Sequence, residues 1–190
     1  LNYINKYIDL KDGRGRRVLE AGCAIGALSN LLAERGFEAY ASDISNYAII
    51  KARKLSPKVH FSTFDIQKGI PIEGKFDLIL AFEVLEHLLK PEKAVGNMYK
   101  KLVDNGYLVC STPFPYKRYV SLPTHVNVLY PKQWQNIFEK AGFQSEKLKI
   151  SPVFFVPFLY KFHKFFSKVI PFGLDLPYIN STVFIIAQKI

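Results

Sequence analysis

Short apolar runs rich in β-branched and aromatic residues alternate with longer amphipathic stretches along most of this chain. This alternation is typical of β-strand, α-helix, β-strand units, which build a parallel sheet with helices on its faces. The predicted strands are residues 17–21, 38–42, 59–62, 76–81, 106–111, 144–150 and 182–188. The predicted helices are residues 26–35, 46–54, 83–88, 91–102 and 131–141. The sequence therefore predicts an α/β fold with a doubly wound, seven-stranded sheet.

The length of 190 residues suits one sizeable core and is short for two ordinary domains. We therefore expect a single domain over residues 1–190. The longest apolar stretch, residues 152–160, is interrupted by Pro157 and is well short of a membrane span.

The connection before the last predicted strand, residues 151–178, is rich in aromatic side chains. On a helical projection one face is apolar and the other carries Lys161, Lys164 and Lys168. The first interpretation is a helical lid packed on the sheet or on a ligand pocket. The alternatives are an apolar substrate pocket and an interfacial helix, with residues 154–170 touching anionic lipid.

A glycine-containing turn follows the first predicted strand and precedes a helix: Glu20-Ala-Gly-Cys-Ala-Ile-Gly26. Its backbone N–H groups and the helix N-terminus favour an anionic or polar ligand above the strand ends. The next strand ends in Asp43, 21 residues after Gly22, where a carboxylate can accept both hydroxyls of a ribose. The pattern indicates an adenine nucleoside cofactor. The dinucleotide fingerprint is broken because Ala occupies position 24, which disfavours a nicotinamide-dependent oxidoreductase.

Several ordered motifs extend this pattern: VLEAGCAIG, ASDIS, FDI, FDLILAFEVLEHL, LVDNGYLVCSTP and, near the end, WQNIFEKAGF. With them the sequence resembles the class I S-adenosylmethionine-dependent methyltransferases, especially the small-molecule group that includes the ubiquinone-pathway O-methyltransferases. The resemblance covers residues 17–143 and resumes in the last strand. It implies a Rossmann-like sheet whose first five strands are parallel and whose last strand is antiparallel. It also implies S-adenosyl-L-methionine as cofactor and a small-molecule acceptor.

The resemblance assigns the cofactor site residue by residue. Glu20 would support the glycine loop, Asp43 and Ile44 would hold the ribose end, and Asp65 would accept from the adenine amine. An alternative role for Asp65 is to cap the following turn. The full implied cofactor-binding set is Glu20, Gly22, Cys23, Ala24, Gly26, Asp43, Ile44, Asp65, Ile66, Phe82 and Glu83.

Two features of that set carry their own expectations. Ala24 stands where the family usually has Gly, so a positive φ there would bring strain or a shifted loop. Cys23 has no base near it in sequence, which favours a small core-facing residue over a nucleophile.

Glu83, Glu86 and His87 fall at i, i+3 and i+4 of a predicted helix and hence on one face. They could bind a divalent ion, or His87 could serve as a general base. Acids in a first helical turn are also favoured by the helix dipole alone, and we favour that interpretation over a metal site. The catalytic candidates are His87 and, in the loop after the fifth strand, His125.

The chain carries a net charge of +10 and only two cysteines, Cys23 and Cys110. Two distant cysteines form no disulfide framework, so we expect a cytoplasmic protein, with a peripheral membrane contact as a further possibility. The charge raises the alternative of a nucleic-acid methyltransferase, but the flipped-base signature after the fourth strand is replaced by Ala-Phe-Glu-Val. A non-catalytic docking module built on the same fold is the remaining alternative, and Ala24 is its support.

Overall fold

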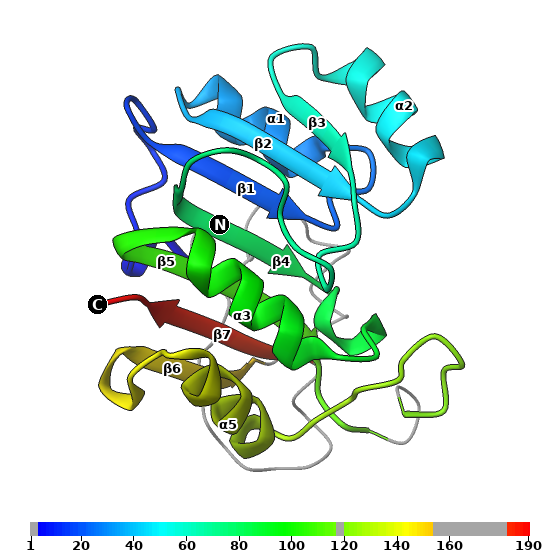
Figure 1. Cartoon of the computed structure of the whole chain (residues 1–190), viewed down its shortest axis with the longest axis vertical. Helices are drawn as coiled ribbons and strands as arrows, with labels where there is room; N and C mark the ends of the chain where they lie inside the picture. The colour runs from blue at the N-terminus through cyan, green and yellow to red at the C-terminus, as the bar shows by residue number, and fades with distance from the viewer. Residues whose placement is uncertain (1–3, 117–119, 154–181) are drawn as a thin grey trace, which may run out of the picture.

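The computed structural model describes residues 4–116, 120–153 and 182–190, which form one seven-stranded sheet with helices on both faces (Figure 1). The strand order is β3-β2-β1-β4-β5-β7-β6. The strands are β1 (Arg17–Ala21), β2 (Glu38–Asp43), β3 (His60–Thr63), β4 (Phe76–Phe82), β5 (Leu102–Pro113), β6 (Leu148–Val153) and β7 (Thr182–Gln188). β7 pairs antiparallel with both β5 and β6, and the other pairs are parallel. The predicted fold class is confirmed.

Helices α1 (Ala27–Glu34) and α2 (Asn46–Leu55) cover one face of the sheet. Their buried residues Leu32, Ile49 and Ala52 join the core on that side. Helices α3 (Pro91–Lys101) and α5 (Pro131–Ala141) lie together over the other face (Figure 1), where Trp134 and Phe138 are fully buried. The two apolar faces of the strands explain their near-continuous hydrophobic sequences.

The chain reverses its winding direction between β1 and β4. β2 and β3 lie on one side of β1, whereas β4, β5, β7 and β6 lie on the other. In open α/β sheets, ligands bind outside the carboxyl ends of the strands at such a switch point. We call the side of the sheet where β1, β2, β4 and β5 end the ligand edge, and the opposite side the amino edge.

The predicted elements agree with the structure to within one residue except in three places. β5 starts four residues before and ends two residues after the predicted 106–111 strand. Residues 145–147 form a 3-10 turn, so the sixth strand runs from Leu148 to Val153 instead of the predicted 144–150. The predicted helix over residues 83–88 is wrong. Glu83 has φ +53°, a left-handed conformation, so it cannot be the first residue of a right-handed α-helix, and only a 3-10 turn, η2 (Leu85–His87), follows.

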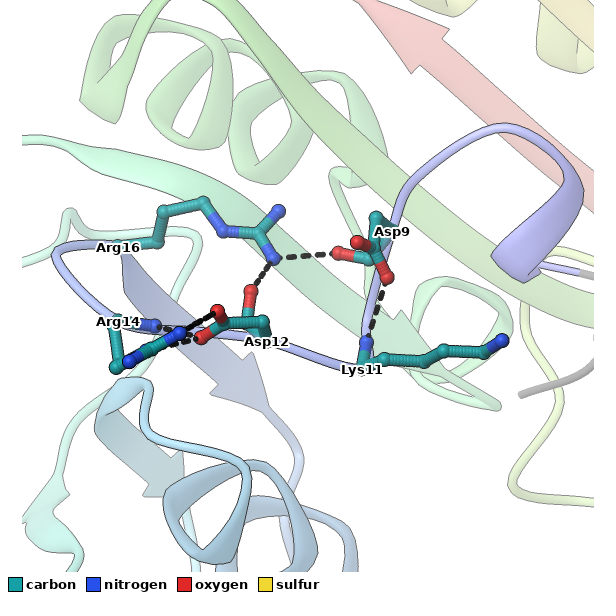
Figure 2. Close-up of polar contacts among 5 residues, drawn as sticks. All are labelled: Asp9, Lys11, Asp12, Arg14 and Arg16. Carbon is teal, nitrogen blue, oxygen red and sulfur yellow. Dashed lines mark hydrogen bonds and ion pairs between the residues drawn. The ribbon is translucent and has the colours of Figure 1, made fainter.

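At the amino edge, the turn before β1 is held by local charge pairs (Figure 2). The Arg14 guanidinium donates to both carboxylate oxygens of Asp12, and Arg16 donates to the carbonyl oxygens of Asp9 and Asp12. The Lys11 N–H donates to the Asp9 carboxylate at 2.9 Å. These exposed contacts shape a turn that leads from the buried N-terminal residues Ile4, Ile8 and Leu10 into β1.

Residues 154–181, which include most of the aromatic connection predicted as a lid, lie outside the described residues. Its ends are described, because Thr182 pairs with Val153 of β6 and with Pro113 of β5. Pro113 is the last residue of β5, so both ends of the connection lie at the ligand edge.

None of the helices in the described ranges has the length and apolar character that crossing a membrane requires.

Candidate active site

A cavity of about 280 Å³ opens at the ligand edge, above the switch point between β1 and β4. It is lined by residues that follow three strand ends and by the 3-10 turn after β4. The lining residues are Ala21, Gly22, Ser42, Asp43, Ile44, Phe64, Asp65, Ile66, Glu83, Val84, His87 and Leu88. Seven of them belong to the predicted site: Gly22, Asp43, Ile44, Asp65, Ile66, Glu83 and His87.

The turn between β1 and α1 needs left-handed backbone at three positions. Gly22, Ala24 and Gly26 have φ values of +73°, +47° and +76°. A Cβ on Gly22 would lie 2.3 Å from a methyl carbon of Val84, so the close approach of the backbone also demands glycine there. The loop can therefore bring its N–H groups close to a ligand only with these small residues.

Glu20 does not line the cavity; it holds the first turn of α1, directly after this loop, through hydrogen bonds. Its buried carboxylate accepts hydrogen bonds from the Ser29 N–H at 2.9 Å and from the Ser29 hydroxyl. Gly26 precedes α1 and has no side chain to cap it, so Glu20 satisfies one of the free N–H groups of the first turn. Burial raises the pKa of Glu20.

Asp43 holds the turn from the neighbouring strand. Its Oδ2 accepts the Ala24 N–H at 3.0 Å and its Oδ1 accepts the Ser45 N–H at 2.8 Å. A carboxylate has about four lone-pair sites, so each oxygen keeps one for a ligand hydroxyl. The positive φ at Ala24 is therefore accommodated by a hydrogen bond to the residue predicted to bind ribose, and the loop stays in place.

Asp65 performs one of the two roles that the sequence left open, and its position is compatible with the other. Its Oδ1 accepts the backbone N–H of Gln67 at 2.9 Å and the Gln67 side-chain amide at 3.2 Å, which caps the following turn. Asp65 also lines the cavity beside Phe64 and Ile66. Because both of these bonds end on Oδ1, Oδ2 can accept from a ligand amine.

The strand end of β4 differs from the sequence prediction in its details. Glu83 lines the cavity and accepts the Ser111 hydroxyl at 2.7 Å. Phe82 does not line the cavity, because its ring packs against Phe184 at 5.8 Å between centroids, on the α1 side of the sheet. The residues Glu83, Glu86 and His87 do not share a helical face, since no α-helix forms here.

The 3-10 turn instead brings Glu86 and His87 beside His125. One ligand-type atom from each of the three residues lies within 4.8 Å of the others, and the two imidazole rings meet edge to face at 4.9 Å. The backbone N–H groups of Val126 and Asn127 both donate to the Glu86 carbonyl oxygen, which fixes the loop carrying His125 against η2. Three such groups could hold one divalent ion, and this set differs from the one that the sequence suggested.

The protonation of this group follows from its contacts. His87 Nδ1 lies 2.8 Å from the Thr124 carbonyl oxygen, which can only accept, so Nδ1 carries the proton and Nε2 presents a lone pair. Glu86 is fully buried, and neither carboxylate oxygen has a hydrogen-bond partner among the described residues. Burial, and then the charge of Glu83, raise the pKa of Glu86 to about 8. Glu86 is therefore a neutral acid at pH 7, with Oε1 3.8 Å from His87 Nε2.

Cys23 is buried and unsuited to nucleophilic chemistry. Burial, and then the charges of Glu20 and Asp43, raise its pKa to about 12, so the thiolate is scarce at neutral pH.

Sequence reasoning missed five lining residues, Ala21, Ser42, Phe64, Val84 and Leu88, of which the last three form apolar walls of the cavity. Each stands directly beside a predicted site residue, so position next to a strand end was the available signal. Only the fold shows which neighbours point inward. Cys23, Ala24, Gly26 and His125, by contrast, belong to the predicted set but lie outside the cavity lining.

The charge of the site is opposite to that of the whole chain. Asp43, Asp65 and Glu83 line the cavity, while the chain as a whole carries +10. An acidic cavity favours a cationic ligand, and the sulfonium of S-adenosylmethionine is a cation. Three further features fit this cofactor: the tight glycine turn after β1, Asp43 at the end of β2 with one free lone pair on each oxygen, and the polar and apolar walls around Asp65. Fold and site together define a class I S-adenosylmethionine-dependent methyltransferase.

Comparison with known proteins agrees with this class. Residues 3–148 match the family described as "Methyltransferase domain", and the chain belongs to that family. It is similar to the ubiquinone biosynthesis O-methyltransferase of Coxiella burnetii, with 31% identity over 116 residues, covering 59% of this chain and 48% of that protein. It is also similar to a probable S-adenosylmethionine-dependent methyltransferase of Mycolicibacterium smegmatis, with 30% identity over 142 residues, covering 70% and 53%.

Among solved structures, the fold is similar to phosphoethanolamine N-methyltransferase 2 of Haemonchus contortus in complex with S-adenosyl-L-methionine. The TM-score is 0.70 at 16% identity, and the match covers 98% of this chain and 51% of that chain. The chain spans about half the length of the curated relatives it matches.

Proposed function

We propose that this chain methylates a hydroxyl group of a small, partly apolar acceptor, with S-adenosylmethionine as donor and His87 as general base. The observation that carries the proposal is the orientation of His87. His87 lines the cofactor cavity. Its Nδ1 proton is donated to the Thr124 carbonyl oxygen, which leaves the Nε2 lone pair available to accept a proton. An amine acceptor, which can react without a base, is the second possibility.

The donor, when bound, supplies a methyl group activated by the sulfonium. The residues of this chain would bind the donor and the acceptor, orient them toward each other, and remove a proton from the acceptor hydroxyl. Asp43 and the 22–26 loop would hold the nucleoside and methionine ends of the donor, and the acceptor oxygen would lie in line with the methyl–sulfur bond. Such positioning can lower a barrier by roughly 7–11 kcal/mol in the best cases.

The proton would pass from the acceptor hydroxyl to His87 Nε2. The imidazolium formed there would lie 3.8 Å from Oε1 of the neutral Glu86 carboxyl and, because the His87 side chain keeps 41% of its surface exposed, would release the proton to water after methyl transfer. His125, 4.9 Å away between ring centroids, is the other candidate base. No step requires a metal ion.

A partly apolar acceptor is supported by exposed side chains near the two histidines. Leu89, Leu122 and Val126 keep 78%, 43% and 48% of their surface exposed, and they flank His87 and His125 in the chain. A ligand with an apolar portion would cover them with a gain of about 25 cal/mol per Å² buried. The contribution of residues 154–170 to acceptor or membrane binding stays a prediction.

The test is turnover of methyl-labelled S-adenosylmethionine with a panel of apolar phenols and amines, comparing wild type with His87→Gln and His125→Asn. We expect His87→Gln to lower kcat for phenols by about 100-fold or more while cofactor affinity, measured by calorimetry, is unchanged. Equal kcat in His87→Gln and wild type would contradict the assigned base.

The competing function is a docking module that has lost catalysis. Ala24 was the sequence feature in its favour, and the intact Asp43–Ala24 contact weakens that argument. Cofactor binding without turnover of any phenol or amine in the panel would favour the module.

A further inference from the structure

The outward side of α2 combines exposed apolar and basic side chains. Tyr47, Ile50 and Leu55 keep 68%, 47% and 63% of their surface exposed, and Lys51 and Lys54 are exposed between them. We call these five residues the α2 outer face. Single exposed apolar residues are ordinary, but three on one short helix form a surface that needs an explanation.

The spacing makes this surface one continuous stripe. Positions 47, 50, 51, 54 and 55 are related by steps of three and four, so they share one side of the helix. The core needs none of them, because Ile49 and Ala52 on the opposite side are fully buried against the sheet. Figure 1 shows α2 at the outer end of the sheet, beside the edge strand β3.

The chain segment that carries this stripe has charges of one sign, and Asp43 and Asp65 lie just outside it at the ligand edge. From residue 44 to residue 64 the chain has four basic residues and no Asp or Glu. The first turn of α2 also lacks an acid, although the helix dipole would favour one there. In the described part of the chain, no carboxylate forms an ion pair with Lys51 or Lys54, and the Lys51 ammonium lies 4.4 Å from the centroid of the Tyr47 ring.

We propose that the α2 outer face docks on the headgroup region of an anionic lipid bilayer. Two other partners fit less well. Lysine is depleted in protein–protein interfaces, and a nucleic acid backbone provides phosphates but no apolar surface for Ile50 and Leu55. A bilayer surface satisfies both kinds of side chain, since lysines extend to the headgroups while tyrosine and aliphatic residues enter the interface.

Docking there would place the cofactor cavity near the membrane. α2 starts three residues after Asp43, and its N-cap is Ser45, whose N–H binds the Asp43 carboxylate. The N-terminal end of the α2 outer face therefore lies at the ligand edge, where an acceptor taken from the bilayer would enter. The surface stands apart from the residues assigned to catalysis, so lipid docking can hold or fail independently of the proposed function.

The test is cosedimentation of the full chain with vesicles of phosphatidylcholine alone and of phosphatidylcholine mixed with phosphatidylglycerol. We expect binding only to the anionic vesicles, weakened by salt. Lys51→Gln/Lys54→Gln should lower the partition coefficient about 30-fold, from roughly 1 kcal/mol per lysine near an anionic surface. Ile50→Ser should lower it while leaving all charges in place. The matched control is Lys132→Gln/Lys140→Gln, which removes the same charge from exposed positions of α5.

Calorimetric titration with S-adenosylmethionine is run on every variant, and unchanged affinity demonstrates that each remains folded. The proposal is overturned if wild type does not bind anionic vesicles or if the α5 control loses as much binding as the α2 variant. It is also overturned if Ile50→Ser leaves vesicle binding intact but dissociates a dimer seen by analytical ultracentrifugation, which would identify a second copy as the partner. Binding of single-stranded RNA that Lys51→Gln/Lys54→Gln abolishes, without vesicle binding, would assign the surface to nucleic acid.

Discussion

The amino edge and the ligand edge of the sheet differ in how their polar groups are paired and in the backbone conformations they contain. At the amino edge, Arg14 and Asp12 pair at the surface, and Arg16 donates to two backbone carbonyl oxygens. At the ligand edge, Ala24 and Glu83 take left-handed backbone conformations that side chains disfavour, and the buried Glu86 carboxyl has no hydrogen-bond partner among the described residues. Asn105 at the amino edge also has a positive φ, of +65°, but asparagine tolerates this conformation better than alanine or glutamate. The disfavoured backbone conformations and the unpaired buried acid therefore concentrate at the ligand edge, where the cavity opens.

The largest effect is expected from Asp43→Ala at the ligand edge. The substitution removes the acceptor for the Ala24 and Ser45 N–H groups and the proposed ribose contacts. Two charge-assisted hydrogen bonds are worth about 1.5–3 kcal/mol each, so the affinity for S-adenosylmethionine should fall about 1000-fold in isothermal titration. Asp104→Ala, which removes an exposed carboxylate at the start of β5, is the amino-edge control and should keep wild-type affinity. Equal losses in both variants would erase the contrast between the edges.

Glu86→Gln tests the unpaired buried acid through the pH dependence of stability. The pKa of Glu86 is about 8 in the folded protein and near 4.5 when unfolded, so the folded state holds the proton more tightly. Wild-type stability should therefore fall as pH rises from about 4.5 to 8, whereas the neutral amide has no such dependence. At pH 7 the variant should be more stable than wild type by about 3 kcal/mol, and at pH 4 the difference should vanish.

Urea unfolding at pH 4, 5.5 and 7 measures this difference, with the exposed Glu92→Gln as control. A pH-independent gap between Glu86→Gln and wild type would mean that Glu86 is ionised in the fold.

Ala24→Gly sharpens the comparison by releasing strain without removing a contact. The φ of +47° costs alanine about 1 kcal/mol relative to glycine, so the free energy of unfolding should rise by up to that amount. The Ala24 N–H still reaches Asp43, so cofactor affinity should change little. Thermal unfolding and titration measure the two effects. Gly22→Ala is the opposing case, because its Cβ would meet Val84 at 2.3 Å and both stability and affinity should fall.

The smallest effect is expected from Arg14→Ala at the amino edge. The pair with Asp12 is fully exposed, and although it lowers the pKa of Asp12 to about 2, water and salt screen such contacts. The melting temperature and the cofactor affinity should both match wild type within experimental error. A melting temperature clearly below that of wild type would show that the turn in Figure 2 stabilises the fold beyond its local contacts.

Much of the fold could be predicted because local periodicity and tertiary burial agree. The helix at residues 131–141 and the strand at residues 182–188 have the predicted bounds, because proline starts the helix, glycine follows it, and a continuous apolar run between Thr182 and Gln188 fills the strand. The prediction failed at residues 83–88, where helix-type spacing was present but Glu83 leaves β4 in a left-handed conformation. That backbone is imposed by the neighbouring strand, because the Glu83 N–H donates to Ser111 and its carboxylate accepts from the same residue.

The sequence by itself determined the class of sheet, the glycine turn, and Asp43 and Asp65 at successive strand ends, because these depend on local spacing and on the shared direction of parallel strands. Only the tertiary structure decided that Phe82 leaves the site, that Glu83 pairs with Ser111, and that Glu86, His87 and His125 meet. The physical reason is distance along the chain. Residues 38 positions apart come together through packing of the 124–127 loop on η2, and no local pattern encodes that contact.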